Sequence, residues 1–427
     1  MRVLVAGASG LIGTAVCARL DAAGHDVVRV VRDGRRVLPG TQAILLDMAG
    51  ATSPEDWFAH LAGVDVVVNC AGVLQESARE DPRGVHATGA AAMFAACARS
   101  GIRRIIHFSA IGVDREQRST FSATKLTGDE ALMALPVDWV ILRPSVVLGR
   151  GAFGASALMR GLAALPVLPV MPGAGRLQVV QMDDVIATVV FFLPSDRPSR
   201  LVLELAGPEA LTMSEVVERY RRWLGWKPAR QLVLPPWAGS VLYRAGDLAS
   251  WFGWRPPIRT NAEKEIARGA TGDPEPWARA TGIRPLQLDE ALAAKPPSVQ
   301  ERWFARLYFA KPAIFIVLPF FWIMTGIVSL TVGWRSGVEL LLPTFVARFA
   351  EAAVVAGAIA DIAVGALIAW RPTSRAGIWG AIGISLFYAT AGTILRPDLW
   401  AEPLGPLMKI LPILILHFVA LAILEER

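Results

Sequence analysis

The chain has 427 residues, of which 53% are hydrophobic and 19% are charged, and its mean hydropathy is +0.43. This composition is too apolar for a soluble enzyme of this size, so we expect part of the chain to lie in lipid. The net charge is +6, yet no dense cluster of lysine and arginine is interleaved with aromatic residues, which argues against a nucleic-acid partner. The three cysteines form no CxxC pair, and this favours a reducing compartment.

Short apolar runs and helical patterns alternate through the first 144 residues, with short connections between them. This alternation predicts an α/β fold, a doubly wound Rossmann domain with a parallel sheet. The predicted strands are residues 2–6, 26–32, 42–46, 64–69, 104–109 and 138–142. The predicted helices are residues 11–22, 54–62, 84–101 and 120–135.

The alternation loosens from about residue 145 to residue 297, where proline and glycine are frequent. We interpret this stretch as a small substrate or lid region of the same domain, packed on the carboxyl ends of the sheet strands. It includes short strands at 178–181 and 201–205 and helices at 183–193 and 212–223. The first domain therefore spans residues 1–297, and residues 298–311, which begin with Ser298 after two prolines, are the predicted linker.

The remaining residues, 312–427, are almost wholly apolar and predict an all-α four-helix transmembrane domain. The apolar stretches are residues 312–334, 348–370, 376–395 and 406–424. Each is close to the ~20 residues that a helix needs to cross a bilayer.

Charge around these stretches predicts the orientation. Four spans with the Rossmann domain in the cytoplasm place most flanking cations inside, which agrees with the positive-inside rule and predicts a multi-pass protein of the cell inner membrane. The inside set is Arg302, Arg306, Lys311, Arg371, Arg375 and Arg427, and the outside set is Arg335, Arg396 and Lys409.

A glycine-rich loop, GASGLIG, lies between the first predicted strand and the first predicted helix. This position is the one that a dinucleotide-binding fingerprint requires, because the glycines allow a tight turn and the helix N-terminus then faces the pyrophosphate. The predicted cofactor contacts from this loop are Gly7, Ser9, Gly10, Leu11, Ile12 and Gly13.

The end of the second predicted strand indicates which dinucleotide binds. An acidic residue there would accept a hydrogen bond from a ribose 2′-hydroxyl, whereas a guanidinium would pair with a 2′-phosphate. Arg32 stands first at this end, with Arg35 and Arg36 close behind, so NADP(H) is favoured over NAD(H). Asp33 leaves NAD(H) open as one alternative. A second alternative is that Arg32 is only a solvated charge and does not select the cofactor.

These features resemble the extended and atypical short-chain dehydrogenase/reductase superfamily over residues 1–225. Within it, the chain is most similar to the branch of the NADPH-binding accessory subunit of complex I and to the NAD-dependent epimerases and dehydratases. The residues that carry this resemblance are residues 7–13, Asp47, residues 69–72, Ser109, Lys125, residues 142–145 and Asp184. The tail resembles the DoxX-like membrane module by its arrangement and hydrophobicity.

The resemblance implies further site residues. Asp47 would contact the adenine, and Ala71 and Gly72 would line the cofactor. Lys125 would bind its ribose. The residues implied near the nicotinamide are Pro144, Ser145, Val146 and Val147.

The superfamily's catalytic Tyr-x-x-x-Lys pair is altered. In those enzymes the tyrosine exchanges a proton with the substrate oxygen, and the lysine lowers its pKa. In this chain Phe121 takes the place of the tyrosine, while Lys125 is kept and Ser109 can bond a substrate carbonyl. The four tyrosines are Tyr220, Tyr243, Tyr308 and Tyr388, all well downstream.

Three interpretations of Phe121 stay open. Thr124, Ser109, Tyr220 or a water molecule could supply the proton. The reaction could instead be a hydride transfer that needs no strong acid, to a quinone or an activated alkene. The third interpretation is a non-catalytic cofactor-binding scaffold or redox sensor attached to a membrane complex. We therefore expect a membrane-anchored oxidoreductase with an apolar or membrane-borne substrate, and the scaffold as the alternative.

The tail also carries polar residues. Arg348 and Glu351 share a helix face in the predicted second span and can pair, and Asp361 lies deep in that span. They predict either a proton or quinone site between helices, or a polar lock between helices or a protonated Asp361. His417 predicts a packed or hydrogen-bonded ring rather than a ligand. Since no cluster of His, Cys and carboxylate residues has metal-ligand spacing, we predict no metal.

Overall fold

The computed structural model describes residues 1–34, 40–73, 81–116 and 119–425. These residues form two compact units. The sheet unit consists of Met1–Asp247 and Pro256–Ala305, and the helical unit consists of Leu248–Arg255 and Arg306–Arg427. Each unit is described by itself.

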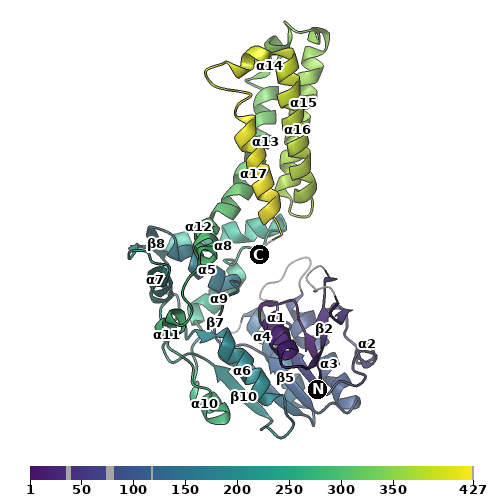
Figure 1. Cartoon of the computed structure of the whole chain (residues 1–427), viewed down its shortest axis with the longest axis vertical. Coiled ribbons are helices and arrows are strands. Elements are labelled where there is room, and N and C mark those ends of the chain that lie inside the picture. Colours follow the sequence, from purple (N-terminus) through teal and green to yellow (C-terminus); the bar gives the residue numbers. More distant parts are fainter. Residues whose placement is uncertain (35–39, 74–80, 117–118, 426–427) are drawn as a thin grey trace. The chain divides into compact units, whose positions relative to one another are not determined.

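The described part of the sheet unit contains a seven-stranded sheet in the order β10-β6-β5-β4-β1-β2-β3, with every pair of neighbours parallel (Figure 1). The predicted Rossmann-like α/β fold is therefore confirmed. In sheet order, the strands are β10 (Leu201–Leu205), β6 (Asp138–Pro144), β5 (Arg104–Phe108), β4 (Val66–Asn69), β1 (Arg2–Ala6), β2 (Asp26–Val31) and β3 (Ala43–Leu45).

Both faces of this sheet are covered, which is why its strands are near-continuous apolar runs. One face packs against α1 (Leu11–Ala22) and α6 (Met182–Phe192), with Val5 and Leu20 fully buried in the cluster between them. The other face packs against α2 (Glu55–Phe58), α3 (Gly89–Arg99) and α4 (Thr120–Met133). Between Asp81 and α3, residues Gly84–Thr88 form a π-helical turn, η2, where one long helix was predicted.

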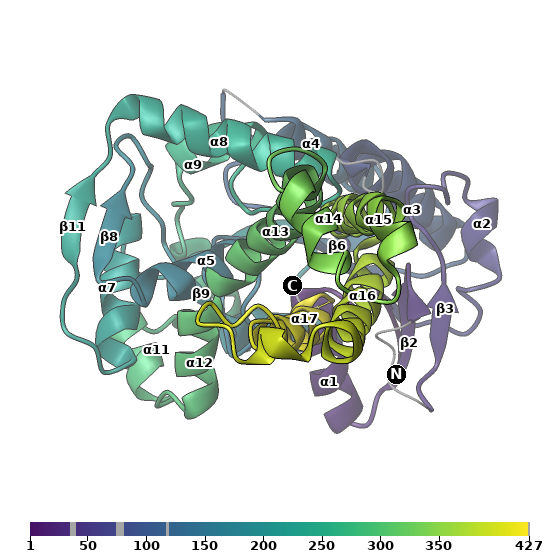
Figure 2. The ribbon, with the colours of Figure 1, turned by 90° about the horizontal axis from the view of Figure 1, so that it is seen from above.

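The region from residue 145, predicted as a small substrate or lid region of the same domain, adds a strand to the main sheet, since β10 pairs with β6. The cause is the helix α6, which crosses the face of the sheet as the connection before β10. The other strands form two short parallel pairs. One pair is β7 (Val147–Leu148) with β9 (Val180–Gln181), and the other is β8 (Val167–Val170) with β11 (Arg230–Val233), which Figure 2 shows.

Six further helices of the described chain complete this region, and the first, second and last of them contribute to a third apolar cluster, which includes Met159, Val217 and Tyr220. They are α5 (Gly154–Ala163), α7 (Met213–Trp223), α8 (Pro236–Trp251), α9 (Thr260–Arg268), α10 (Glu275–Thr281) and α11 (Leu288–Ala293).

Residues 298–311 are not an extended linker, since they contain the helix α12 (Val299–Leu307). Ser298 and Glu301 form the capping pair that starts this helix. The backbone N–H of Ser298 donates to Glu301 Oε2 at 2.8 Å, and the N–H of Gln300 donates to Ser298 Oγ at 3.1 Å. Such capping satisfies free amides of the first helical turn. This helix was not predicted from the sequence, because the two prolines before Ser298 indicated a linker.

In the helical unit, three of the described helices are long and apolar enough to cross a membrane. They are α13 (Ala310–Leu330), α15 (Ala350–Ala369) with the 3-10 turn before it, and α16 (Ser374–Leu395), and they run side by side (Figure 1). The fourth predicted span is the shorter apolar helix α17 (Ile410–Ile423), because residues 406–409 form turns after Gly405 rather than helix. A short helix, α14 (Trp334–Leu341), follows α13.

The polar residues inside this unit are paired between helices. Tyr388 donates its hydroxyl hydrogen bond to Asp361 Oδ1 at 2.9 Å. The Trp322 indole N–H donates to His417 Nε2 at 2.9 Å, so His417 is the hydrogen-bonded ring that the sequence predicted. Arg348 lies in a 3-10 turn rather than in α15, and its guanidinium stacks over the Phe349 ring, 4.5 Å from the centroid, in place of the predicted pair with Glu351.

Candidate functional site

The glycines after β1 are required by close backbone contacts. Gly7 has a φ of +73°, and a Cβ there would lie 2.7 Å from the backbone of Ala71. A Cβ on Gly13 would lie 2.2 Å from the carbonyl oxygen of Gly7. No side chain larger than hydrogen fits either position, so the loop keeps its backbone open at the carboxyl end of β1.

The loop leads directly into the 12-residue helix α1, whose N-cap is Gly10. Gly10 supplies no side-chain hydrogen bond to the first turn. The first amides of a helix have no partner within the helix, and they carry the positive end of its dipole. This glycine cradle, with uncapped amides beside it, fits the pyrophosphate of a dinucleotide. Ser9, Leu11 and Ile12, the other contacts predicted from this loop, lie within the loop and at the start of α1.

The residues that would select the cofactor lie at the same edge of the sheet. Arg32 follows the last residue of β2 and is exposed, and Asp47 follows β3 and is exposed. Asp47 Oδ1 also accepts a hydrogen bond from the N–H of Ala49 at 3.2 Å, which fixes its turn. Arg35 and Arg36 lie outside the described residues, so the structure leaves Arg32 and Asp33 as the described charges at this end.

Lys125 joins the ends of β4 and β5 from helix α4. Its Nζ donates to the carbonyl oxygens of Ala71, at 3.1 Å, and Phe108, at 2.8 Å, and the residue is only 4% exposed. Burial lowers the pKa of Lys125 to about 8. A Cβ on Gly72 would lie 3.3 Å from this Nζ, so the lysine lies directly under the segment that was predicted to line the cofactor.

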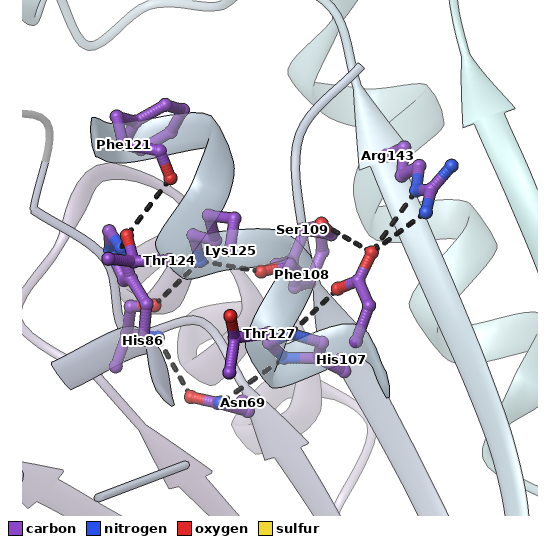
Figure 3. A network of polar contacts seen from close by, with 12 residues as sticks. Asn69, His86, His107, Phe108, Ser109, Phe121, Thr124, Lys125, Thr127 and Arg143 are labelled. Atoms are coloured by element: carbon purple, nitrogen blue, oxygen red, sulfur yellow. Dashed lines mark hydrogen bonds and ion pairs between the residues drawn. The ribbon is translucent and has the colours of Figure 1, made fainter. Parts of the chain in front are cut away.

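Ser109, the other predicted catalytic residue, is engaged by a buried carboxylate. Its hydroxyl donates to Asp129 Oδ2 at 2.9 Å, and the Arg143 guanidinium donates to the same oxygen at 3.0 and 3.2 Å. Burial opposes the ionisation of Asp129, but the neighbouring His107 ring and the Arg143 charge outweigh it and lower the pKa of Asp129. Ser109 therefore donates to an ionised carboxylate, and Figure 3 draws the contacts that Ser109 and Arg143 make with it.

The sequence reasoning missed Asp129 and its partners. His107 Nε2 lies 3.3 Å from Asp129 Oδ1, and Asn69 Nδ2 lies 3.2 Å from His107 Nδ1. The available signal was spacing, since Asp129 follows Lys125 by four residues on one face of α4, with both side chains buried.

A second buried histidine lies beside Phe121. His86 Nε2 accepts the N–H of Val73 at 2.9 Å, so its proton is on Nδ1, which lies 3.0 Å from Thr124 Oγ1. The Thr124 hydroxyl then donates to the carbonyl oxygen of Phe121 at 3.0 Å. The Phe121 ring meets the His86 ring edge-on, with centroids 5.5 Å apart. Figure 3 shows this chain of contacts below Phe121.

Burial, with the Lys125 charge adding to it, lowers the pKa of His86 to about 2. The ring is therefore neutral at ordinary pH, and both of its nitrogens have partners. Thr124, one of the predicted substitute proton donors, has its hydroxyl proton directed to Phe121 O. Tyr220, another of them, is 1% exposed in the third apolar cluster with the Arg160 guanidinium over its ring, and it has no opening toward a substrate.

Helix α9 closes over the start of α4, which the sequence did not predict. Ser122 donates to Glu265 Oε1 at 2.7 Å, Ser119 donates to the same oxygen, and Arg268 pairs with Glu265. Arg268 also donates to Ser122 Oγ at 2.9 Å. The contacts between α9 and the start of α4 join residues more than 140 positions apart, so no local pattern could reveal them.

The segment after α9 fixes the predicted nicotinamide residues. Ser145, which follows β6 directly, donates its hydroxyl to Ala270 O at 2.7 Å, so its side chain positions this segment. Pro144 ends β6, and Val146 and Val147 are partly buried beyond it. The structure thus brings the predicted residues to the carboxyl ends of β1, β4, β5 and β6, and it shows the hydroxyls of Ser109 and Ser145 engaged in internal hydrogen bonds.

Two family models match the chain. Residues 7–160 match a family described as NAD(P)H-binding, and residues 319–418 match the DoxX-like family. The first match contains the glycine loop, Lys125 and Pro144, and the second covers most of the helical unit. The helical unit is therefore a DoxX-like domain, as its arrangement predicted.

A protein of Mycobacterium bovis described as an epimerase family protein is 30% identical over 247 residues, which cover 52% of this chain and 78% of that protein. The chain belongs to the epimerase family. Other relatives of this epimerase-family protein include the 40 kDa subunit of NADH-ubiquinone oxidoreductase from Neurospora crassa, which is 27% identical and covers 66% of the chain and 76% of the subunit. A ceramide reductase of Caulobacter vibrioides is 27% identical over 173 residues, 40% of the chain and 54% of that enzyme.

The chain spans only 23% of the length of the mycobacterial relatives that match it first, which are 30% identical over 217 residues. Among solved structures, the epimerase-family protein is similar to the UDP-glucuronic acid 4-epimerase of Bacillus cereus in complex with UDP-glucuronic acid and NAD. That similarity has a TM-score of 0.53 at 17% identity and covers 72% of this chain and all of that one. At this identity the likeness concerns the fold, and the solved neighbour holds NAD in that fold.

Proposed function

We propose that this chain is a membrane-anchored oxidoreductase that uses NAD(P)H to reduce an apolar, membrane-borne substrate such as a quinone or a lipid carbonyl. The observation that carries the proposal is an intact dinucleotide cradle in a chain that also has three helices of membrane-spanning length. A cofactor site on a membrane anchor serves best a substrate that stays in the bilayer.

The names of two relatives support this substrate class. One is a ceramide reductase, and the other is a subunit of an NADH-ubiquinone oxidoreductase. Both names combine reduction with a lipid-soluble compound, and transfer of that chemistry to this chain is part of the proposal.

The cofactor we propose is NADP(H). Arg32, exposed at the end of β2, would pair with the 2′-phosphate, and Lys125 with its neighbour Ala71 would hold the nicotinamide ribose. The bound dinucleotide would supply the hydride. Gly7 and Gly13 keep the backbone open for the pyrophosphate.

The side chains near the site favour an acceptor that needs no strong acid. Phe121 has no proton to give, and the hydroxyls of Ser109 and Thr124 are directed to Asp129 and to Phe121 O. An acceptor that stabilises negative charge after it gains a hydride, as a quinone does, can then take its proton from water. The electrons balance as two from the hydride to the acceptor, with one proton from solvent.

For the membrane, we propose four spans in the cell inner membrane, with the sheet unit in the cytoplasm. Helix α17, with 14 residues, would be the fourth span, and residues 406–409 would lie at its interfacial end. Arg371 and Arg375, between α15 and α16, would then lie on the cytoplasmic side, as the positive-inside rule favours.

The test is NADPH oxidation by the full chain in lipid nanodiscs. We expect NADPH consumption with a short-chain quinone or a lipid ketone as acceptor, and less with NADH at the same concentration. The reduced acceptor should appear in equal amount. Tight NADPH binding without turnover across a broad set of quinones, ketolipids and activated alkenes would overturn the oxidoreductase.

A second candidate function is a cofactor-binding scaffold or redox sensor of a membrane complex. Phe121 favours it, because the hydrogen-bonded site around it is complete without a substrate. In this case NADPH would bind in nanodiscs with no acceptor reduced, and binding would change which membrane proteins co-purify with the chain. Steady turnover of any acceptor at a useful rate contradicts this candidate.

A further inference from the structure

Helix α8 presents an apolar face to the outside. Trp237 and Trp251 are 68% and 81% exposed, and Val241 and Leu248 between them are more than half exposed. Their spacing of four, seven and three residues places all four on one side of a helix. Exposed apolar faces of this size mark an interaction surface rather than ordinary solvent contact.

The opposite face of α8 fixes this orientation. Gly239, Tyr243 and Gly246 are its buried residues. A Cβ on Gly246 would lie 1.9 Å from the carbonyl oxygen of Ile258, so the helix lies against the chain there with no room for a side chain. A rotation that buried the tryptophans would break this contact, and the apolar face therefore stays outward.

The end of α8 lies where a membrane-length helix ends. Within the helical unit, the Trp254 indole N–H donates to the carbonyl oxygen of Ala369, the last residue of α15, at 2.9 Å. The N–H of Arg371 donates to Phe252 O at 2.9 Å, and the Trp254 and Phe315 rings lie 4.6 Å apart. Within the helical unit, the residues that follow α8 are thus attached to the ends of the candidate spans.

Helix α12 repeats the pattern independently. Val299, Trp303 and Leu307 recur at intervals of four and are all more than half exposed, and α13 begins at Ala310. Tryptophan and aliphatic residues on the outer face of a helix beside a membrane span are typical of the interfacial layer of a bilayer. Arg244 is exposed on the same side of α8 as Val241, where it can reach lipid phosphates.

We propose that α8 is an interfacial helix that lies in the headgroup layer of a phospholipid bilayer, with Trp237, Val241, Leu248 and Trp251 toward the acyl chains. The attachment of its end to the candidate spans favours the bilayer over a protein partner as occupant. The inference rests on the membrane placement in the proposed function and is independent of the catalytic part.

Within the sheet unit, α8 is linked to the candidate site. Asp247, near the end of α8, accepts a hydrogen bond from Arg259 Nε at 3.3 Å and another from Thr260, the first residue of α9. Helix α9 carries Glu265 and Arg268, which contact Ser122 beside Phe121. Within the sheet unit, hydrogen bonds therefore connect α8 to the element that closes over Phe121.

The experiment uses the full chain in nanodiscs of phosphatidylcholine and phosphatidylglycerol. The variant Val241→Cys is labelled with an environment-sensitive fluorophore, and the matched control is Leu286→Cys, in a loop of the sheet unit where Leu286 is 46% exposed. Wild type treated in the same way gives the background from Cys17, Cys70 and Cys97. Both positions are exposed, so neither change threatens folding.

We expect a blue-shifted emission at position 241 and several-fold quenching when lipids with spin-labelled acyl chains are included, with neither effect at position 286. Equal behaviour at the two positions would overturn the proposal. A blue shift without quenching by lipid would also overturn it, since a protein surface or a second copy would then cover α8. NADPH oxidation is measured in the same nanodiscs, so a failure of catalysis is recognised separately from a failure of docking.

Discussion

The phosphate loop and the Phe121–Lys125 segment lie at the same edge of one sheet, yet they are built in different ways. The loop depends on backbone positions that only glycine can occupy, as the contacts of Gly7 and Gly13 demonstrate. The segment depends on polar side chains, and the buried ones already bond to one another or to backbone carbonyls. It follows that the phosphate loop can be complete in a site that lacks the usual tyrosine proton donor.

The largest expected effect is on dinucleotide binding, and it distinguishes Gly7 in the loop from a glycine outside it. Gly7→Ala puts a Cβ 2.7 Å from the Ala71 backbone, whereas Gly24→Ala meets nothing within 4 Å, although both residues have positive φ. We expect Gly7→Ala to raise the dinucleotide Kd about 100-fold or more, because each lost bond to the phosphate costs about 1.5–3 kcal/mol. Titration calorimetry measures both variants.

Gly24→Ala is the control for backbone strain. It should lower stability by about 1–2 kcal/mol, the cost of a left-handed conformation, and leave the Kd unchanged. A thermal melt of Gly7→Ala shows whether it is folded. If folded Gly7→Ala protein bound the dinucleotide as wild type does, the cradle would lie elsewhere.

The next effect is on the rate of ketone reduction, and it tests the Phe121–Lys125 segment by restoring the missing tyrosine hydroxyl. Phe121→Tyr adds a phenol four residues before Lys125, whose positive charge favours the phenolate. We expect ketone reduction with NADPH to rise by up to about 100-fold, the lower range for general acid catalysis. Phe58→Tyr, on α2, is the matched control and should change nothing.

The rate is compared with a ketone and with a quinone. Quinone reduction should change little in Phe121→Tyr, because it needs no strong acid. An equal rise with both acceptors would contradict the proposed division between the two reactions.

The same contrast explains what could be predicted from the sequence. The strands β1 and β10 and the helix α1 have the predicted bounds, because apolar runs, glycines and helical spacing act over a few residues. The glycine loop was found for the same reason. Asp129, His86 and Glu265 were missed, since their roles depend on partners such as Arg143, Thr124 and Ser122 that only the fold brings close.

The membrane part follows the same rule. The three long apolar helices were predicted from length and hydropathy alone, whereas α17 is shorter than its apolar run because residues 406–409 form turns. The outward face of α8 was missed for a different reason. Its apolar residues predict burial in an amphipathic helix, and only the packing of Gly246 shows that they point outward.

A smaller effect concerns Lys125, whose Nζ donates to the carbonyl oxygen of Ala71, the residue whose backbone lies against Gly7. Lys125→Met removes the charge proposed to hold the ribose, and we expect the dinucleotide Kd to rise about 10- to 100-fold, as for loss of a charged hydrogen bond of about 1.5–3 kcal/mol. The exposed Lys264→Met on α9 is the control. In wild type, affinity should fall as the pH rises through about 8, where Lys125 loses its proton.

This pH dependence should be absent in Lys125→Met. Its sign follows from the lowered pKa, since the charged form persists only below about 8. The Kd of wild type is measured from about pH 7 to about pH 9, roughly one unit on either side of the pKa of Lys125. A Kd that stays constant over this range would contradict a charged Lys125 in the cofactor site.

The smallest effect measures the hydrogen bonds that occupy the Phe121 segment. Thr124→Val keeps the shape of the side chain but leaves the buried His86 Nδ1–H without an acceptor, which costs about 1–3 kcal/mol of the free energy of unfolding. Thr127→Val is the control, because Thr127 is exposed on the same helix and donates only to Ala123 O. Its effect should stay within about 0.5 kcal/mol. Denaturant titration in detergent compares the two.

The buried histidine also predicts how this stability varies with pH. The pKa of His86 is about 2 in the folded chain and near 6.5 when unfolded, so below about 6.5 only the unfolded chain takes up the proton. The contribution of neutral His86 to stability is therefore full above 6.5 and falls as the pH drops. Thr124→Val should lower the whole curve without moving this window. If the two threonine variants were equally stable, the His86 contacts would contribute nothing, and Phe121 would lie in a looser site than the phosphate loop beside it.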